Sequence, residues 1–487
     1  MKGFNPLDTI VAIATSQGEG AIGIVRLSGK DALKIADKIF LERSGRKPSE
    51  FKSYTVHYGW IVSSQGSRVT RRIAARSRLR RKGQGSEKNF SSEVIDEVIL
   101  TVMRSPKSYT REDVVEINCH GGIVALRAVL DLVLKNNARL AQPGEFTMRA
   151  FLNGRIDLAQ AEAVLDVIRA KTDSALALGE EQLRGGLSAR IEKIRKMLLS
   201  ALCLLEAGID FPEEEQGSPD PAGLAGKLAK TVSELNKLLE NSRQGRILRE
   251  GLHVVICGKP NVGKSSLLNA LLKKERCIVT PVAGTTRDTI EEIIDIRGIP
   301  VRIVDTAGII EPRDLVEKKA IQRSREQIKI AELVILVFDG TKKMSQDDRV
   351  LISKLKNKPL IAVINKIDAR QKIEKKRLLS LFGRVMEISA RSSRNIELLE
   401  EAIAQLVYRG KVSGRESPLI GNLRQVTAVE QAQKFVAAAA NSLDNKLSPE
   451  FVAQEIKDAL CILDELLGKR FNEELLDKIF ADFCIGK

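Results

Sequence analysis

A phosphate-binding loop is the clearest chemical feature of the sequence. Residues 258–265 read Gly-Lys-Pro-Asn-Val-Gly-Lys-Ser, between an apolar run that ends at Cys257 and an apolar helical pattern. Glycines in such a loop let backbone N–H groups turn toward phosphate oxygens, and the N-terminus of the next helix favours negative charge. Lys264 would reach the outer phosphates, and Ser265 would ligate Mg²⁺. The loop therefore predicts a site for a nucleoside triphosphate with Mg²⁺.

Three further motifs, each after a predicted strand, indicate which nucleotide the site prefers. Asp305-Thr306-Ala307-Gly308 would put a carboxylate beside the metal and a glycine N–H at the γ-phosphate. In Asn365-Lys366-Ile367-Asp368, the last carboxylate can accept from the ring N–H and the amine of guanine, whereas adenine would leave it unpaired. Ser389-Ala390-Arg391 matches the last base-contacting loop of GTPases. Four motifs in this order predict a GTP-binding domain.

A switch region is expected between the first two motifs. Residues 284–288 read Gly-Thr-Thr-Arg-Asp, and Thr286 would complete the Mg²⁺ shell while the γ-phosphate is present. Ile309 follows Gly308, at the position where signalling GTPases carry a glutamine that orients water. Isoleucine cannot orient water, so the catalytic group must come from elsewhere.

The composition limits the class of protein that carries these motifs. The 487 residues exceed the roughly 250 to 300 at which a single core stops growing, so roughly two to four domains are expected. With 43% hydrophobic and 29% charged residues, a largely disordered, collagenous or membrane-embedded chain is excluded. The six cysteines lie far apart, which suggests neither a disulfide framework nor a zinc site and fits a reducing cytoplasm. No apolar run approaches the ~20 residues of a membrane span, and we expect no secretion signal.

The positive charge is unevenly distributed. The formal net charge is +16, and residues 68–88 hold nine Arg and Lys residues against Glu87 alone. A tract of this kind attracts phosphate backbones through the release of counterions. It can equally be a solvated loop. The sequence leaves both interpretations of this basic insert open.

Periodicity divides the chain into parts. Short apolar runs and helical stretches alternate up to about residue 152, which is typical of an α+β domain. Residues 252–409 alternate β-branched runs with helices, which predicts a mostly parallel sheet covered by helices. The predicted fold class is multidomain α+β and α/β. Its parts are an N-terminal α+β domain over 1–153, a helical domain over 154–249, an inserted Ras-like P-loop G domain over 250–411, and the second part of the helical domain over 412–487.

Six short motifs outside the G domain are similar to one family. They are Asp8-Thr9-Ile10-Val11-Ala12, Gly23-Ile24-Val25-Arg26, His120-Gly121-Gly122, Pro143-Gly144-Glu145-Phe146, Ala150-Phe151-Leu152-Asn153 and Phe483-Cys484-Ile485-Gly486-Lys487. With the inserted G domain, they resemble the MnmE or TrmE family of tRNA-modification GTPases.

The resemblance implies an activity and partners. It implies a cytoplasmic GTPase that works with an FAD-containing partner, MnmG/GidA, and adds a carboxymethylaminomethyl or aminomethyl group to C5 of the wobble uridine of certain tRNAs. A tetrahydrofolate, in a 5-formyl or methylene form, would carry the one-carbon unit. Family members form homodimers through the N-terminal folate-binding domain, and K⁺ takes the place of an arginine finger where their G domains meet.

The resemblance also implies roles for residues of the G domain. The K⁺ ligands would be Asn261, Thr280, Val282 and Thr285, and Glu317 would orient the attacking water while Lys264 acts on the phosphates. Mg²⁺ would be held by Ser265 and Thr286. The full expected GTP-binding set is Asn261, Val262, Gly263, Lys264, Ser265, Ser266, Thr280, Thr285, Thr286, Asp305, Thr306, Ala307, Gly308, Asn365, Lys366, Asp368, Ser389, Ala390 and Arg391.

A folate site is implied by the same resemblance at Arg26, Glu116, Arg155 and Lys487. A pterin has adjacent N–H donors that suit a carboxylate such as Glu116, and cations suit the anionic parts of the ligand. The family usually has lysine where Arg155 stands, which keeps the charge but changes the geometry. Cys484 is a candidate thiolate nucleophile, and a buried inert thiol is the alternative.

Two other functions are alternatives to the one that the resemblance implies. A ribosome-assembly GTPase that acts as an RNA-binding switch would explain the G domain and the basic insert, but not the folate-like residues. A self-contained folate-dependent tRNA methyltransferase would need a flavin-binding Gly-x-Gly-x-x-Gly turn that joins a strand to a helix. The match at Gly18, Gly20 and Gly23 leads instead into the apolar strand-like run 22–27.

Overall fold

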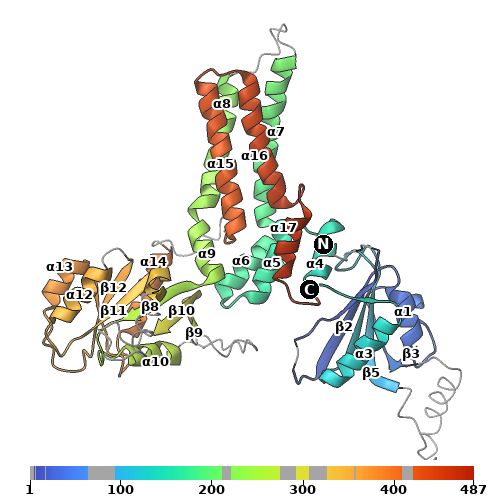
Figure 1. Cartoon of the computed structure of the whole chain (residues 1–487), viewed down its shortest axis with the longest axis horizontal. Coiled ribbons are helices and arrows are strands. Elements are labelled where there is room, and N and C mark those ends of the chain that lie inside the picture. Colours follow the sequence, from blue (N-terminus) through green and yellow to red (C-terminus); the bar gives the residue numbers. More distant parts are fainter. Residues whose placement is uncertain are drawn as a thin grey trace, which may run out of the picture. The chain divides into compact units, whose positions relative to one another are not determined.

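The computed structural model divides the chain into two compact units, drawn in Figure 1. One unit contains Met1–Glu162 together with Leu467–Lys487, and the other contains Ala163–Leu466. The last residues of the chain therefore belong to the N-terminal unit. The residues that the structure describes are 5, 7–16, 18–63, 94–210, 221–274, 292–305, 326–355, 358–408 and 420–487.

The first unit is built on a seven-stranded sheet with the order β3-β4-β5-β6-β2-β1-β7. Neighbouring strands are antiparallel, except that β7 runs parallel to β1. The strands are β1 (Ile10–Ile13), β2 (Ile22–Ser28), β3 (Phe40–Glu42), β4 (Thr55–Val62), β5 (Val94–Met103), β6 (Val114–His120) and β7 (Arg139–Leu140).

Buried side chains alternate with less buried ones along β2 and β6, so one face of this sheet packs into the core. Val25 and Leu27 of β2 and Ile117 of β6 pack into a buried cluster with α1 (Ala32–Ile39) and α3 (Ile123–Lys135). Because successive side chains of a strand point to opposite faces, Arg26 and Glu116 lie on the face away from α1 and α3. A short 3-10 helix, η1 (Pro48–Glu50), packs against α1.

The other end of the chain returns to this unit. Helix α17 (Glu473–Ala481) packs against α4 (Glu145–Leu152), which follows β7. The segment that follows α17 is tied to the start of α4 by two backbone hydrogen bonds. The N–H of Gly144 donates to the carbonyl of Cys484 at 3.3 Å, and the N–H of Phe146 donates to the carbonyl of Lys487 at 3.2 Å.

The second unit joins long helices with the G domain. Helix α8 packs against α7 and α15, and Figure 1 shows α7, α8, α15 and α16 side by side. Arg195 of α7 pairs with Asp464 of α16. Two helical stretches separated by the whole G domain in sequence therefore pack together. The helices are α5 (Leu158–Arg169), which crosses the boundary between the units, α6 (Asp173–Leu183), α7 (Gly186–Asp210), α8 (Pro221–Glu240), α9 (Ser242–Glu250), α15 (Leu423–Asp444) and α16 (Pro449–Leu467).

The G domain has a six-stranded sheet with the order β13-β12-β11-β8-β10-β9. All neighbours are parallel except β9, which is antiparallel to β10. The elements are β8 (Leu252–Cys257), α10 (Lys264–Lys274), β9 (Glu292–Ile296), β10 (Ile299–Asp305), β11 (Leu333–Asp339), α12 (Gln346–Leu355), β12 (Leu360–Asn365), α13 (Lys375–Phe382), β13 (Val385–Glu387) and α14 (Ile396–Tyr408).

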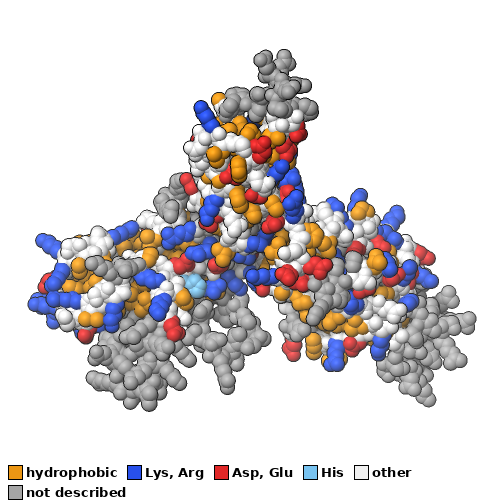
Figure 2. All heavy atoms as spheres, turned by 45° about the horizontal axis from the view of Figure 1, so that its top comes forward, with side chains coloured by type: hydrophobic (Ala, Val, Ile, Leu, Met, Phe, Trp, Pro, Cys, Tyr) orange, Lys and Arg blue, Asp and Glu red, His pale blue; other side chains and the backbone are white. Residues whose placement is uncertain are grey.

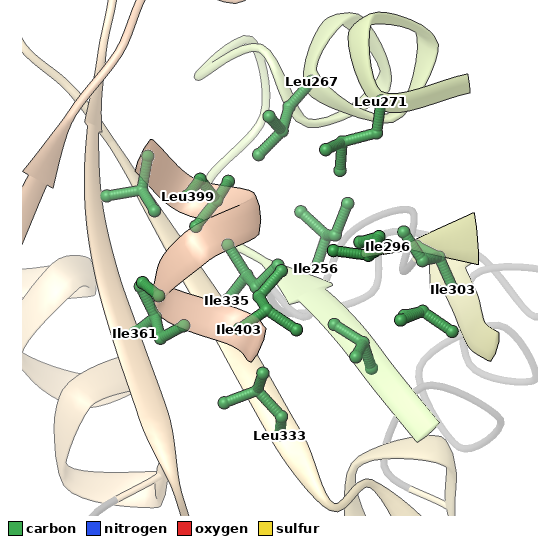
Figure 3. Close-up of a cluster of buried hydrophobic side chains, with 14 of the residues drawn as sticks. Ile256, Leu267, Leu271, Ile296, Ile303, Leu333, Ile335, Ile361, Leu399 and Ile403 are labelled. Carbon is green, nitrogen blue, oxygen red and sulfur yellow. The ribbon is translucent and has the colours of Figure 1, made fainter. Parts of the chain in front are cut away.

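Both faces of this sheet are buried. Ile256 and Ile335 point to the side that is covered by Leu267 of α10 and Leu399 of α14, as Figure 3 shows. Their neighbours in the strands, such as Val255, pack on the other side against α12 and α13. Strands buried on both faces read as continuous apolar runs, which is why the sequence predicted them well.

The predicted fold class, α+β and α/β with a P-loop G domain, is confirmed. Strand β9 was not predicted. Within the described residues, no helix is both long and apolar enough to cross a membrane.

Candidate functional site

The loop between β8 and α10 requires its glycines. Gly258 has a φ of +152°, and a Cβ there would collide with the carbonyl oxygen of Val337 in β11. Gly263 has a φ of +96°, and a Cβ there would collide with the side-chain amide of Asn365. The loop is therefore pressed against the two strands that follow it in the sheet, and its shape excludes larger side chains.

Lys264 lies inside this loop. Its side chain is buried, and its Nζ donates to the carbonyls of Gly258 at 3.1 Å and Lys259 at 3.0 Å. An ammonium held by two neutral carbonyls can exchange them for phosphate oxygens, which bind it more strongly because they are charged. Ser265 and Ser266 are exposed in the first turn of α10.

Asn365, at the end of β12, connects three loops. Its Nδ2 donates to the carbonyl of Val262 at 2.9 Å, and its Oδ1 accepts from the backbone N–H groups of Lys366 at 2.8 Å and Ala390 at 2.9 Å. The side chain is 2% exposed. Asn365 therefore acts as an internal brace that fixes the phosphate loop relative to the two base-contacting motifs, because its bonds to Val262 and Ala390 are buried.

Lys366 adds a second connection. Its Nζ donates to the carbonyl of Asn261 at 2.8 Å and to Asp339 at 2.7 Å. Burial would raise the pKa of Asp339, but the hydrogen bonds from Lys366 and Thr341 outweigh it and hold the pKa below its ordinary value. Asp339 was missed in the sequence. Asp339 could have been found, because it ends the apolar run of β11 and so lies at the same edge of the sheet as the motif residues.

The side chain of Asp368 is exposed, and a hydrogen bond from Ser389 fixes the orientation of its carboxylate. Its Oδ1 accepts a hydrogen bond from the Ser389 hydroxyl at 2.6 Å, which lowers the pKa of the carboxyl. Ser389 is fully buried, and its backbone exchanges two hydrogen bonds with Arg394. The arrangement presents an ionised carboxylate beside the end of β12, where it can accept from two adjacent N–H groups. Arg391 is exposed on the same loop.

A second group of predicted residues meets in the N-terminal unit. Arg26 of β2 and Glu116 of β6 are opposite each other in the strand register, and the Arg26 Nε donates to Glu116 at 2.8 Å. The two side chains are 18% and 20% exposed. The Arg26 guanidinium also donates to the carbonyl of Gly486 at 3.2 Å and lies 5.8 Å from the centre of the Phe146 ring.

The segment that carries Lys487 fits closely against β1. Gly486 has a φ of +95°, and a Cβ there would lie 2.5 Å from the carbonyl oxygen of Ile13. Only glycine suits both the backbone conformation and this close approach. Arg26, Glu116 and the Lys487 segment are thus brought together from positions more than 300 residues apart.

Arg155 is connected to the residues around Arg26 through the ring of Tyr109. Its guanidinium lies 4.7 Å from the centre of the Tyr109 ring and donates to the Tyr109 carbonyl at 3.2 Å. Tyr109 packs against a small cluster that contains Ile10, Ala12, Ala141 and Phe146. Arg26 and Arg155 therefore lie on the two aromatic side chains of one apolar cluster.

A buried ion network supports the start of α4. Arg149 is 2% exposed and pairs with Glu145 at 3.0 Å and Glu112 at 3.1 Å. Arg139 pairs with the same Glu145 at 2.7 Å. Burial raises the pKa of Glu145, but the hydrogen bond from Arg139 and the nearby guanidiniums outweigh it, so its pKa lies below the ordinary value. Nothing in the sequence pattern indicated that these charges would be internal.

Cys484 is an exposed free thiol. The alternative of a buried inert thiol was therefore wrong. The error arose because Phe483 and Ile485 beside it suggested an apolar environment, whereas only Phe483 is buried and Ile485 is 51% exposed.

Comparison with known proteins identifies the family. The model described as "MnmE helical domain" matches residues 158–484, and the model "GTP-binding protein TrmE N-terminus" matches residues 9–155. The tRNA modification GTPase MnmE of Desulforamulus reducens is 42% identical over 483 residues, which are 99% of each chain. The chain belongs to the MnmE family of tRNA modification GTPases.

A second MnmE relative agrees with this assignment. MnmE of Geobacillus thermodenitrificans is 43% identical over 483 residues, again 99% of each chain. A crystal structure of an Aquifex aeolicus Era variant bound to GDP·AlF4⁻ is 29% identical, covers 37% of this chain and 65% of that chain, and has a TM-score of 0.27. The chain is thus a GTP-hydrolysing enzyme of the MnmE family, and the ribosome-assembly alternative is not supported.

Several predicted residues lie outside the described part of the chain. These are the basic insert 68–88 and Thr280, Val282, Thr285, Thr286, Thr306, Ala307, Gly308 and Glu317. Asp305 ends β10, and only its backbone is described. The roles of all these residues stay predictions.

Proposed function

We propose that this MnmE-family GTPase uses GTP hydrolysis to support addition of a carboxymethylaminomethyl or aminomethyl group to C5 of the wobble uridine of certain tRNAs. It would do so in the cytoplasm, as a homodimer, together with an FAD-dependent MnmG/GidA partner. A tetrahydrofolate in the 5-formyl or methylene form would supply the one-carbon unit. The family assignment supports the tRNA reaction, and the arrangement of Arg26, Glu116 and the Lys487 segment is the observation that carries the folate step.

GTP would bind across the carboxyl edge of the G-domain sheet. The Lys264 ammonium would leave its two carbonyl partners for the β- and γ-phosphates, and Asp368 would accept from guanine. Ser265 and Thr286 would hold Mg²⁺, which offsets the charge that develops on the transferred phosphoryl group. Glu317 would orient the water that attacks it.

A monovalent cation would be held beside the phosphate loop. Asn261 has a φ of +66°, and its carbonyl already accepts from Lys366, so its side-chain oxygen is the group left to face a cation. With Thr280, Val282 and Thr285 it would bind K⁺. A fixed positive charge there would stabilise the transition state as an arginine finger does.

The surroundings of Arg26 fit a folate. The carboxylate of Glu116 can accept from the N–H groups of a pterin, and the hydrogen bond from its partner Arg26 orients that carboxylate. Phe146 and Tyr109 belong to the apolar cluster below, which suits the flat ring system. Arg155 and Lys487 supply cations for the anionic part of the ligand. When bound, the folate would carry the one-carbon unit that the reaction consumes.

The test is mass spectrometry of wobble uridines. Cells lacking the protein should accumulate tRNA without the C5 substituent, and the wild-type gene should restore it. Arg26→Gln should fail to restore it, whereas Lys434→Gln, which changes an exposed residue of α15, should succeed. Normal wobble uridines in cells without the protein would contradict the proposed function. Full restoration by Arg26→Gln would contradict the folate step alone.

A further inference from the structure

A hollow lined by lysines lies between α7 and α8 of the second unit. Its volume is about 680 Å³, and its polar lining comes from Glu192, Lys193, Lys196 and Ser200 of α7 with Lys227 and Lys230 of α8. We call this feature the lysine groove. None of these residues belongs to the nucleotide site or to the residues around Arg26.

Acids neutralise only part of the positive charge of the lysine groove, because four lysines and one glutamate line it. Glu234 acts on Lys193 through its charge but is paired with Lys237. Glu192 pairs with Arg195 at 3.6 Å. Lys227 donates to the Ser200 hydroxyl at 3.1 Å. Lys193, Lys196 and Lys230 are exposed, and none of them forms an ion pair with a described residue. Three ammonium groups are therefore available to an external anion.

Other lysines of the helical region form ion pairs. Lys237 of α8 pairs with Glu234 at 2.7 Å, and Lys457 of α16 pairs with Glu206 at 3.0 Å. On the face drawn in Figure 2, Lys and Arg side chains are spread over the described surface and are interspersed with Asp and Glu. The lysine groove differs from this mixed pattern because four lysines and a single acid, Glu192, line one hollow.

The spacing of the lysines places them in two rows. Lys193 and Lys196 are three residues apart on α7, and Lys227 and Lys230 are three residues apart on α8, so each pair shares one helix face. Lysine ammoniums act as point charges that suit phosphate oxygens. Within the described residues, the lining contains no aromatic ring on which a base could stack. The chemistry is that of contact with a phosphate backbone, without reading of the base sequence.

We propose that the lysine groove binds the phosphate backbone of the tRNA on which this family acts, an inference that rests on the proposed function. The groove lies on packed helices, so it would fix the position of the RNA while other parts of the assembly act on the wobble uridine. Protein interfaces are enriched in arginine and depleted in lysine, and the cations that line this groove are lysines alone. An RNA backbone is therefore favoured over an acidic protein surface.

The test is the salt dependence of tRNA binding. The full-length protein is titrated into a fluorescently labelled tRNA transcript, and anisotropy is read between 50 and 200 mM KCl. Lys193→Gln/Lys230→Gln removes one cation from each helix. It should weaken binding by about tenfold and make the slope of log K against log salt shallower by about two. Lys193→Arg/Lys230→Arg should restore both quantities.

A matched control removes two exposed lysines elsewhere in the second unit, one on α15 and one in the turn that follows it. Lys434→Gln/Lys446→Gln has the same charge change and should leave the slope and the affinity unchanged. Equal thermal unfolding midpoints of the two glutamine variants would show that the fold is kept.

Three results would overturn the inference. If the wild-type protein binds tRNA and Lys193→Gln/Lys230→Gln keeps its affinity and slope, the groove is not the contact and the proposed function stands. If that variant keeps tRNA binding but loses association with the flavoprotein partner, the groove is a protein interface. If the wild-type protein binds no tRNA at 50 mM KCl, the proposed function fails together with the inference.

Discussion

The two predicted sites of this molecule are built in different ways. The nucleotide site takes its residues from short motifs at the ends of β8 and β12 and after β13, and one buried side chain, Asn365, connects them. The second site takes Arg26 and Glu116 from neighbouring strands and is completed by the segment around Gly486 from the other end of the chain. The first depends on an internal brace, and the second depends on a docked segment.

This difference determines how each site should fail. Loss of Asn365 removes three hydrogen bonds at once, two of them buried, and should disturb all base-contacting loops. Release of the Gly486 segment should leave the sheet intact and remove only the part of the site that the segment supplies. Among the predictions below, Asn365→Ala and Gly486→Ala each change one of these supports.

The largest effect is expected for Asn365→Ala. It should weaken GDP binding about 100-fold, because three hydrogen bonds worth about 1 kcal/mol each are lost and two of their partners stay buried. Isothermal titration calorimetry measures the change. Asn445→Ala removes an exposed hydrogen bond to Asn441 on α15 and serves as the control. A loss below about fivefold for Asn365→Ala would mean that the motifs hold their positions without the brace.

Replacing Na⁺ with K⁺ should give the next largest effect. GTP turnover should rise by about tenfold or more, because a cation beside Asn261 offsets charge between the phosphates. Asn261→Ala should remove most of the difference. Steady-state phosphate release in the two salts measures it, and equal rates for the wild-type protein would remove the proposed cation site.

Gly486→Ala tests the docked segment. The strain of a positive φ and the contact with Ile13 should together cost about 1 to 3 kcal/mol, so 5-formyltetrahydrofolate should bind about tenfold more weakly while GTP turnover is kept. Gly45→Ala is the matched control, since Gly45 has a φ of +83° in the same unit but nothing within 4 Å of its Cβ position. Equal folate affinity for Gly486→Ala and Gly45→Ala would show that docking of the segment does not matter.

The smallest effect concerns stability and pH in the N-terminal unit. Burial raises the pKa of Glu42, but hydrogen bonds from Ser44, Arg46 and His57 outweigh it and lower the pKa to about 2. Because its pKa is lower in the folded protein, the ionised Glu42 stabilises the fold at pH values above its ordinary pKa of 4.5. This stabilisation is lost as the pH falls toward about 2. Glu42→Gln should therefore lower Tm by a few degrees at pH 7 and by less at pH 3. A difference that does not depend on pH would point to packing instead of charge.

The two sites also differ in how far the sequence predicted them. The strands of the G domain were evident because they are buried on both faces, and the motif residues follow them directly. Strand β9 was missed because Glu292–Ile296 is short and mixes charged with apolar residues. Asp339 was missed because no known motif marks it, although it pairs with Lys366.

Long-range contacts could not be predicted from periodicity. Arg149 belongs to a short helix with polar residues, and it is buried only because Glu145 and Glu112 meet it inside the unit. The docking of Gly486 against Ile13 likewise joins opposite ends of the chain. The resemblance to a family named Arg26, Glu116 and Lys487, but the contacts that join them were visible only in the fold.

The central claim is that Asp368 selects guanine at a site shaped by the phosphate loop. Calorimetry with GDP, ADP and XDP tests it on the wild-type protein and on Asp368→Asn. Xanthine has an oxygen where guanine has its exocyclic amine, so an asparagine amide should favour XDP, whereas the wild-type carboxylate should favour GDP over both alternatives by about 100-fold or more. Equal affinity of the wild-type protein for GDP and ADP, or an unchanged preference for GDP in Asp368→Asn, would contradict the account.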